Sequence, residues 1–185
     1  MTPVFFDIDT QNDFVLPAGS LYAPGAERII PAIAALNRYA ADHGIPLIST
    51  MCSHAENDPE FRDWPAHCVR DTAGQRKPAA TLVPGQTILE KQDLDIFRSP
   101  KLQPLLNQFD ASEYIVYGVV TEVCVKFAAE GLLNLRKPVT VVTDAVQALE
   151  QAAADMFLER FCRAGGRLTT AAAITHGGFL RPSSL

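Results

Sequence analysis

Short apolar runs alternate with longer amphipathic segments along this chain of 185 residues, and this alternation restricts the possible folds more than any other feature. The expected strands occupy residues 4–8, 45–51, 87–90, 114–120, 139–143 and 167–172. The expected helices occupy residues 24–43, 102–109, 121–135 and 149–164. Because parallel strands need long crossover connections, this order predicts a doubly wound, mostly parallel, six-stranded sheet. Helices would cover both of its faces, giving a three-layer α-β-α architecture of the α/β class.

Length and charge limit the organisation and the partners of the chain. No linker or internal repeat divides it, so we expect one domain over residues 1–185. Lys and Arg number 16 against 21 Asp and Glu, a net charge of −5 without long runs of like charge, which disfavours nucleic-acid binding. Neither a signal-peptide pattern nor a membrane-length apolar stretch is present. We expect a cytoplasmic protein with a small-molecule partner, and neither nucleic acid nor membrane.

Three reactive side chains fall where expected strands end. The first strand runs into Asp7 and Asp9, Lys91 follows the third, and Cys124 lies where a helix begins after the fourth. Ligands of open parallel sheets bind beyond the carboxyl ends of the strands. A helix N-terminus lowers a thiol pKa and can hold an oxyanion, and a nearby carboxylate could take the thiol proton. Strand alternation points Asp7 and Asp9 the same way, so these residues alone leave the base ambiguous.

Each of these residues also has an ordinary interpretation. Cys124 could be a small core residue between two valines, Lys91 a surface cation, and Asp13 a cap of the turn that follows Asp9. The conjunction of acid, base and thiol at neighbouring strand ends favours the catalytic interpretation. Phosphate-binding glycine motifs and the serine hydrolase motif G-x-S-x-G are absent, so the chemistry must rest on other residues.

The irregular segment from residue 52 to residue 84 carries a candidate metal site. It contains Cys52, His54, Glu60 and His67. Two imidazoles, a carboxylate and a thiol suit Zn²⁺ or a similar divalent ion. Two histidines in a loop also occur together without any metal, so the composition of the segment leaves both interpretations open.

Three motifs in this order resemble those of the isochorismatase-like cysteine hydrolase superfamily, whose fold is Rossmann-like. They are residues 9–14 (DTQNDF), Lys91, and residues 118–125 (GVVTEVCV). The resemblance implies that Asp9, rather than Asp7, is the catalytic acid and base, that Lys91 accompanies it, and that Cys124 is the nucleophile. It also implies a cis peptide bond between Val119 and Val120, and an oxyanion hole formed by the amides of Val120 and Cys124.

Residues 64–68 (WPAHC) are similar to the nicotinamidase branch of that superfamily. This likeness implies a divalent metal, zinc first, on His54, His67 and Glu60. Cys52 occupies a ligand position where the family usually has Asp. Phe14 and Trp64 match positions that flank an aromatic substrate ring. Residues 92–101 lack the usual nicotinamidase pattern, which leaves the exact substrate open. The family is usually dimeric or larger, which implies a homo-oligomer.

The activity implied by the resemblance is cysteine-dependent hydrolysis of the C–N bond of a small aromatic or heteroaromatic carboxamide. It would proceed through a thioester and release ammonia, as in a nicotinamidase-like amidohydrolase. Two alternatives remain. One is hydrolysis of a vinyl ether, as in an isochorismatase, and the other is a non-catalytic binding module that carries a reactive thiol.

Overall fold

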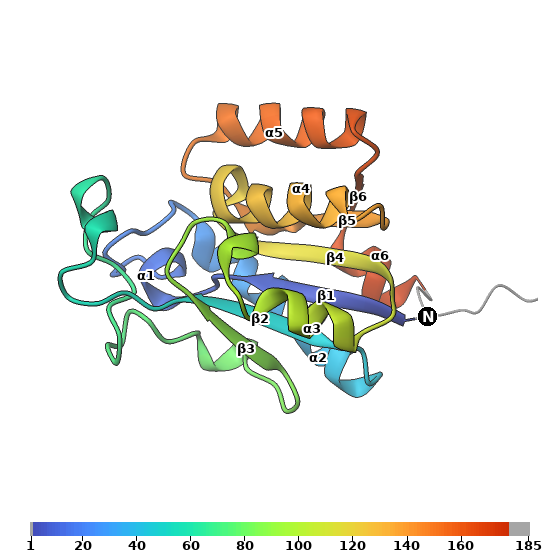
Figure 1. Cartoon of the computed structure of the whole chain (residues 1–185), viewed down its shortest axis with the longest axis horizontal. Helices are drawn as coiled ribbons and strands as arrows, with labels where there is room; N and C mark the ends of the chain where they lie inside the picture. The colour runs from blue at the N-terminus through green and yellow to red at the C-terminus, as the bar shows by residue number, and fades with distance from the viewer. Residues whose placement is uncertain (1, 178–185) are drawn as a thin grey trace, which may run out of the picture.

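The computed structural model describes residues 2–177 and contains a parallel sheet of six strands in the order β3-β2-β1-β4-β5-β6 (Figure 1). The strands are β1 (Thr2–Ile8), β2 (Leu47–Cys52), β3 (Thr87–Lys91), β4 (Ala111–Val119), β5 (Val139–Gln147) and β6 (Arg167–Thr169). The predicted α/β class and doubly wound sheet are therefore confirmed. Successive strands add outward from β1 in one direction and from β4 in the other, so the order reverses between these two central strands.

Helices cover both faces of the sheet, as predicted. They are α1 (Asn12–Val15), α2 (Ile30–Asp42), α3 (Leu102–Gln108), α4 (Lys126–Asn134), α5 (Gln151–Arg163) and α6 (Ala171–His176). One buried cluster joins α2 and α6 to strand residues such as Phe5 and Ile115, and the other joins α3, α4 and α5 to residues such as Phe6 and Val116. Adjacent strand residues thus serve opposite cores, which explains why the strands are apolar on both faces.

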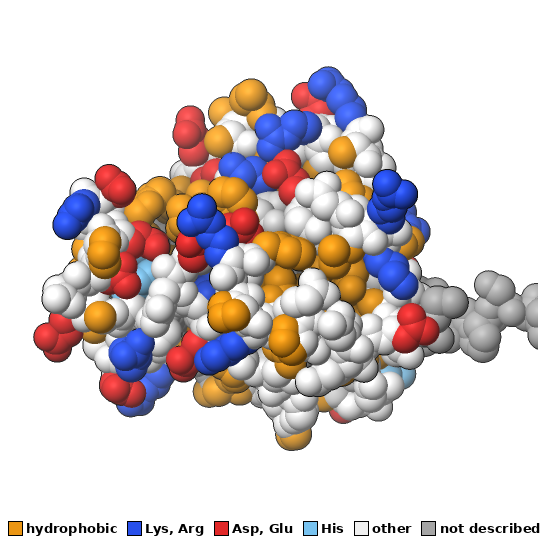
Figure 2. Space-filling view, in the orientation of Figure 1, with side chains coloured by type: hydrophobic (Ala, Val, Ile, Leu, Met, Phe, Trp, Pro, Cys, Tyr) orange, Lys and Arg blue, Asp and Glu red, His pale blue; other side chains and the backbone are white. Residues whose placement is uncertain are grey.

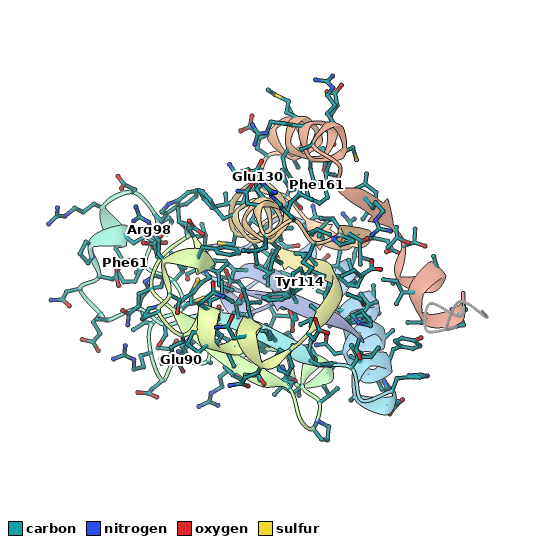
Figure 3. The ribbon with its side chains drawn as sticks, turned by 45° about the vertical axis from the view of Figure 1, so that its right-hand side comes forward. Phe61, Glu90, Arg98, Tyr114, Glu130 and Phe161 are labelled. Atoms are coloured by element: carbon teal, nitrogen blue, oxygen red, sulfur yellow. The ribbon has the colours of Figure 1, made fainter. Side chains whose placement is uncertain are left out.

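The core on the side of α4 and α5 combines aliphatic side chains with a few large aromatic ones. In Figure 3, Phe161 lies on the inner side of α5, toward α4, and Tyr114 lies on β4. The rings of Phe6 and Tyr114 meet edge to face, with 5.8 Å between their centroids. Arg160 and Glu130 form an ion pair between α5 and α4 with an N–O distance of 2.7 Å. The ion pair joins the exposed sides of α5 and α4, while Phe157 and Phe161 bring α5 into the same buried cluster as the strands.

Some predicted boundaries were wrong. The strand expected at 167–172 ends at Thr169, and Ala171 already begins α6, whose first turn is capped by the Thr170 hydroxyl. The Asp144 carboxylate also accepts the Ala171 amide at 2.7 Å, so a residue distant in sequence helps this helix to start. The strand expected at 139–143 continues to Gln147, past the exposed Thr143 and Asp144 that interrupt its apolar pattern.

Two expected helices begin later than predicted. The helix expected at 24–43 starts as a 3₁₀ turn (Ala26–Ile29), and α2 itself begins at Ile30 with a proline in its first turn. The helix expected at 121–135 opens with one wider π turn, Thr121–Val125, before α4. Cys124 therefore lies in this opening turn, and π turns of this kind are frequent at functional sites.

The close approach of β1 and β4 requires glycine at position 118. Gly118 has a φ of +118°, and a Cβ atom there would lie 2.1 Å from the carbonyl oxygen of Ile8. Only glycine adopts this backbone conformation readily while also lacking a side chain. The peptide bond that follows, between Val119 and Val120, is cis, in agreement with the implication of the resemblance.

The surface shows no concentration of one sign of charge on the face seen in Figure 2, where acidic and basic side chains are interspersed. Within residues 2–177, the helices are all too short or too polar to cross a lipid bilayer.

Candidate active site

Asp9 leaves the strand alternation that the sequence predicts for it. β1 ends at Ile8, and Asp9 has a φ of +46°. Its backbone N–H donates to Thr50 Oγ1 at 3.0 Å, and the Thr50 hydroxyl donates to Asp9 Oδ1 at 2.6 Å. Asp7 stays within the strand, on the α2 side of the sheet, where its Oδ2 lies 3.1 Å from Lys77 Nζ. The left-handed turn thus separates the two carboxylates, so they do not point the same way as strand alternation predicts.

Lys91 holds the strand ends together at one point. Its Nζ lies 2.8 Å from Asp9 Oδ2 and 3.6 Å from Cys124 Sγ. It also donates to the carbonyl of Asp93 at 3.1 Å and to Cys52 Sγ at 3.2 Å. Asp9, Lys91 and Cys124 are all buried. The structure therefore brings together the three residues that the sequence places at the ends of β1 and β3 and after β4.

The charges of this trio follow from burial and from the ion pair. Burial opposes ionisation of Asp9, but the Lys91 ammonium and hydrogen bonds from Lys91 and Thr50 hold the Asp9 pKa below its usual value. Burial also opposes the charge of Lys91, yet Asp9 and the neighbouring thiols raise the Lys91 pKa well above its usual value. Burial, with the Asp9 charge, raises the Cys124 pKa well above that of an ordinary thiol, although Lys91 opposes this. At neutral pH the trio is a carboxylate, an ammonium and a thiol.

The backbone around Cys124 is arranged by the opening turn of the helix. The amides of Val123 and Val125 both donate to the carbonyl of Val120, at 3.1 and 3.2 Å. Val120 and Cys124 line the same pocket, so their backbones lie beside the nucleophile. This placement is compatible with the implied oxyanion hole, which stays a prediction.

A pocket of about 360 Å³, counted with its open mouth, lies over Cys124. Most of its wall is apolar or aromatic, and the polar atoms come from a few side chains. The wall is formed by Phe14, Leu21, Leu94, Trp64, Val119, Val120, Val123 and Leu149, together with Cys52, Glu60, His67 and Cys124. Phe14 and Trp64 both border this pocket, and the Phe14 ring centroid lies 5.3 Å from that of His67. The pocket suits a small, flat, largely apolar molecule.

Three of the four predicted metal ligands gather at one side of this pocket. Potential ligand atoms of His54, Glu60 and His67 all lie within 4.8 Å of one another. The Glu60 carboxylate Oε1 lies 3.6 Å from His67 Nε2 and 4.0 Å from His54 Nε2. The Pro65 carbonyl lies 2.7 Å from His67 Nδ1, which assigns the proton to Nδ1 and leaves Nε2 free to bind.

The surroundings of His54 fit a metal. Its ring is fully buried, and both of its ring nitrogens lack a hydrogen-bond partner, although Asp58 Oδ2 approaches Nδ1 to 3.1 Å. Leaving a buried polar atom without a partner is unfavourable, and a cation bound to Nε2 would satisfy it. The donor set of two imidazoles and one carboxylate is the one that zinc commonly takes when a coordination position stays open.

Cys52 is not part of the group formed by His54, Glu60 and His67. It ends β2 in register with Lys91 on β3, and this pairing directs its sulfur to the Lys91 ammonium rather than toward the histidines. The predicted fourth ligand is thus placed beside the catalytic trio.

The sequence analysis missed the side chains that fix the turn after β1. The Gln11 amide donates to the carbonyls of Cys52 and Gln75, at 2.8 and 2.7 Å, and accepts the Cys52 amide at 2.7 Å. Asp13 accepts the Cys68 amide at 2.7 Å, so it anchors the segment that carries His67. Asp13 thus has a structural role, but it accepts the amides of Ser20 and Cys68 rather than capping the turn that follows Asp9. The signal was the unusual run of polar residues directly after a buried strand.

Comparisons with known proteins agree with this geometry. The family model for the isochorismatase domain matches residues 3–173. The nicotinamidase of Escherichia coli (strain K12) is 26% identical over 200 residues, which cover 89% of this chain and 93% of that protein. An Arabidopsis thaliana protein described as a probable inactive nicotinamidase is 27% identical, over 76% of this chain and 78% of that protein. The crystal structure of the pyrazinamidase of Pyrococcus horikoshii in complex with zinc superposes with a TM-score of 0.86 at 26% identity, over 92% of this chain and 99% of that one.

Proposed function

We propose, from the premise that this chain belongs to the isochorismatase family and to its nicotinamidase-like branch, that it is an amidohydrolase acting on a small aromatic or heteroaromatic carboxamide. The observation that carries the proposal is the position of Lys91 Nζ, 2.8 Å from Asp9 Oδ2 and 3.6 Å from the Sγ atom of Cys124, which borders the pocket. A thiol, a carboxylate and an ammonium so arranged have the parts that nucleophilic catalysis requires.

In the first step, the Cys124 thiol attacks the carboxamide carbon. Its proton passes to the Asp9 carboxylate, which the low pKa of Asp9 keeps ionised and ready to accept it. A new S–C bond forms, and the electron pair of the C=O bond moves to oxygen. Lys91 remains beside both groups, so its charge stabilises the negative charge during the transfer.

The intermediate then collapses to a thioester. The amides of Val120 and Cys124 would hold the oxyanion, because both residues border the pocket at the nucleophile. Asp9 returns its proton to the leaving nitrogen, the C–N bond breaks, and ammonia departs. Asp9 next takes a proton from water, whose oxygen attacks the thioester carbon. Breakage of the S–C bond releases the carboxylic acid, and Asp9 passes its proton to the sulfur, which restores the Cys124 thiol and the Asp9 carboxylate.

His54, Glu60 and His67 would hold a divalent cation, zinc being the expected one. When bound, it supplies a Lewis-acidic contact for a heteroatom of the substrate. Phe14 and Trp64 would lie against the substrate ring, since both border the same pocket. We also propose homo-oligomeric assembly, which the resemblance implies, and a cytoplasmic location, which rests on the sequence pattern alone.

The test is ammonia release from nicotinamide and pyrazinamide by the purified, zinc-supplemented protein. We expect one equivalent of ammonia per equivalent of carboxylic acid. Cys124→Ala should abolish release, and Asp9→Asn should lower kcat by on the order of 10²–10⁴. Both variants should keep the far-ultraviolet circular dichroism of the parent. Activity retained by Cys124→Ala, or no ammonia from any member of an aromatic amide panel, would contradict the proposal.

A binding protein without catalysis is the second candidate. The likeness to a plant protein described as probably inactive favours it, as does the position of Cys52 outside the metal-binding group. Calorimetry separates the two candidates, because a binding module would take up nicotinamide or nicotinate with a measurable heat and release no ammonia. The vinyl-ether alternative has no specific support in the structure.

A further inference from the structure

One wall of the pocket is formed by a loop rather than by the sheet or by the helices that pack on it. Leu149 lies between β5 and α5 and borders the same pocket as Cys124. Figure 1 shows this connection at the end of the sheet where α4 begins. Its side chain is partly buried and packs against the apolar cluster that contains Val119 and Val120. The position of this wall therefore depends on whatever fixes the loop.

A single carboxylate fixes it. Glu122 Oε1 accepts the backbone amides of Leu149 at 2.9 Å and of Glu150 at 2.7 Å. These amides directly precede the first turn of α5, a helix of 13 residues, where a negative charge is favourable. Glu122 stands two residues before Cys124, in the same π turn. The nucleophile and the loop are thus connected through one side chain.

The side chains that border the pocket differ in polarity. Glu60, His67, Cys52 and Cys124 supply polar atoms to the pocket, whereas Leu149, Val123 and Leu94 offer hydrocarbon only. A substrate group that meets these hydrocarbon side chains gains by being apolar, and loses binding when it is too large for the space.

We propose that Leu149 determines which amides this site accepts, and that Glu122 is the residue that positions it. The inference rests on the proposed amidohydrolase function and deepens it. It assigns as substrates single-ring carboxamides such as nicotinamide, and excludes fused two-ring carboxamides such as quinoline-3-carboxamide. Glu122 acts through Leu149 and has no part in the chemical steps.

The experiment compares kcat/KM for quinoline-3-carboxamide with kcat/KM for nicotinamide in the zinc-supplemented enzyme. Leu149→Ala should raise this ratio about tenfold or more, because loss of an apolar wall of this size changes discrimination by that order. Leu135→Ala is the matched control, since Leu135 is a partly exposed leucine that does not border the pocket, and its ratio should equal that of the parent.

Glu122 is tested with three variants. Glu122→Ala should raise the ratio in the same direction as Leu149→Ala, and the double variant should add little to either. Glu122→Gln retains an oxygen acceptor and should restore the parental ratio. Glu122→Asp withdraws the carboxylate by one methylene and should give a smaller rise, which keeps the test decisive if Glu122→Ala does not fold. A merely structural role would instead lower activity on both amides equally.

An unchanged ratio in Leu149→Ala, with nicotinamide still hydrolysed, would overturn the assignment of the wall while leaving the proposed function intact. A parental ratio in both Glu122→Ala and Glu122→Asp would overturn the positioning role. Failure of the parent enzyme to release ammonia from any member of the aromatic amide panel would instead overturn the proposed function, and this inference with it.

Discussion

At the scale of single residues, the resting charges of the trio decide how the thiol reacts. Cys124 keeps its proton because burial and the Asp9 charge outweigh the Lys91 ammonium. The nucleophile is therefore activated only when proton transfer accompanies attack, unlike a thiol that is ionised beforehand at a positive helix terminus. Asp9 and Lys91 act on the Cys124 pKa in opposite directions, and this opposition can be measured.

The rate of alkylation by iodoacetamide, itself a small amide, should report the Cys124 pKa. In the parent protein we expect slow modification at pH 7 that accelerates steadily as the pH is raised, because the Cys124 pKa lies well above that of an ordinary thiol. Asp9→Asn removes a charge that raises the Cys124 pKa, so modification at pH 7 should be faster, about tenfold for each pKa unit lost. Lys91→Met removes the opposing charge, so modification should be slower. Mass spectrometry of the Cys124 peptide separates this reaction from that of the exposed Cys162. Equal rates in all three proteins would contradict these assigned charges.

Some positions of the site residues could be predicted from the sequence and others could not, for physical reasons. The proximity of Asp9, Lys91 and Cys124 could be predicted because the carboxyl ends of parallel strands converge, whatever the details of side-chain packing. The direction of Asp9 could not be deduced from alternation, since the left-handed turn after Ile8 depends on hydrogen bonds to Thr50, 41 residues away. The direction of Cys52 depends on the register of β2 against β3, which the sequence does not reveal.

At the scale of elements, the junction of β1 and β4 has little tolerance for change. Gly118→Ala would place a methyl group against the Ile8 carbonyl and hold alanine at a φ of +118°. We expect a loss of unfolding free energy of roughly 3 kcal/mol or more, from backbone strain and overpacking together. Urea denaturation measures it. Gly44→Ala is the control, because Gly44 has a φ of +63° with open space around it and should cost only about 1 kcal/mol. Similar losses in the two variants would show that the close approach to Ile8 is unimportant.

Elements with strong periodicity were predicted well, and those that depend on distant partners were not. The four long helices and all six strands were recognised from their apolar spacing. α6 was not predicted, and the strand expected at 167–172 ran into its first two residues, because the start of α6 relies on a carboxylate from β5. β5 was predicted too short because its polar Thr143 and Asp144 face solvent. The local sequence pattern reveals neither the distant carboxylate nor the exposure of these polar side chains.

At the scale of the whole molecule, a bound cation should contribute to stability. Zinc should bind with a stoichiometry near one, and at 100 times its Kd should stabilise the fold by about 2.7 kcal/mol. Removal by a chelator should reverse the rise in Tm. His67→Ala should lose zinc binding in calorimetry, whereas His43→Ala, at an exposed histidine of the α2 terminus, should keep it. Zinc binding by His67→Ala with the affinity of the parent would show that the ion lies elsewhere.

Two carboxylates near the end of β1 each pair with a different buried lysine, Asp7 within the strand with Lys77 and Asp9 in the turn after it with Lys91. Both lysines belong to the stretch that follows β2. The two ion pairs therefore attach this outer part of the sheet to its centre. Removal of one partner would leave the other as an isolated ion in the protein interior. This would lower the free energy of unfolding far more than removal of both partners. During evolution the aspartate and the lysine of each pair can therefore change only together. Each aspartate thus restricts the substitutions that are tolerated at a lysine remote from it in the chain.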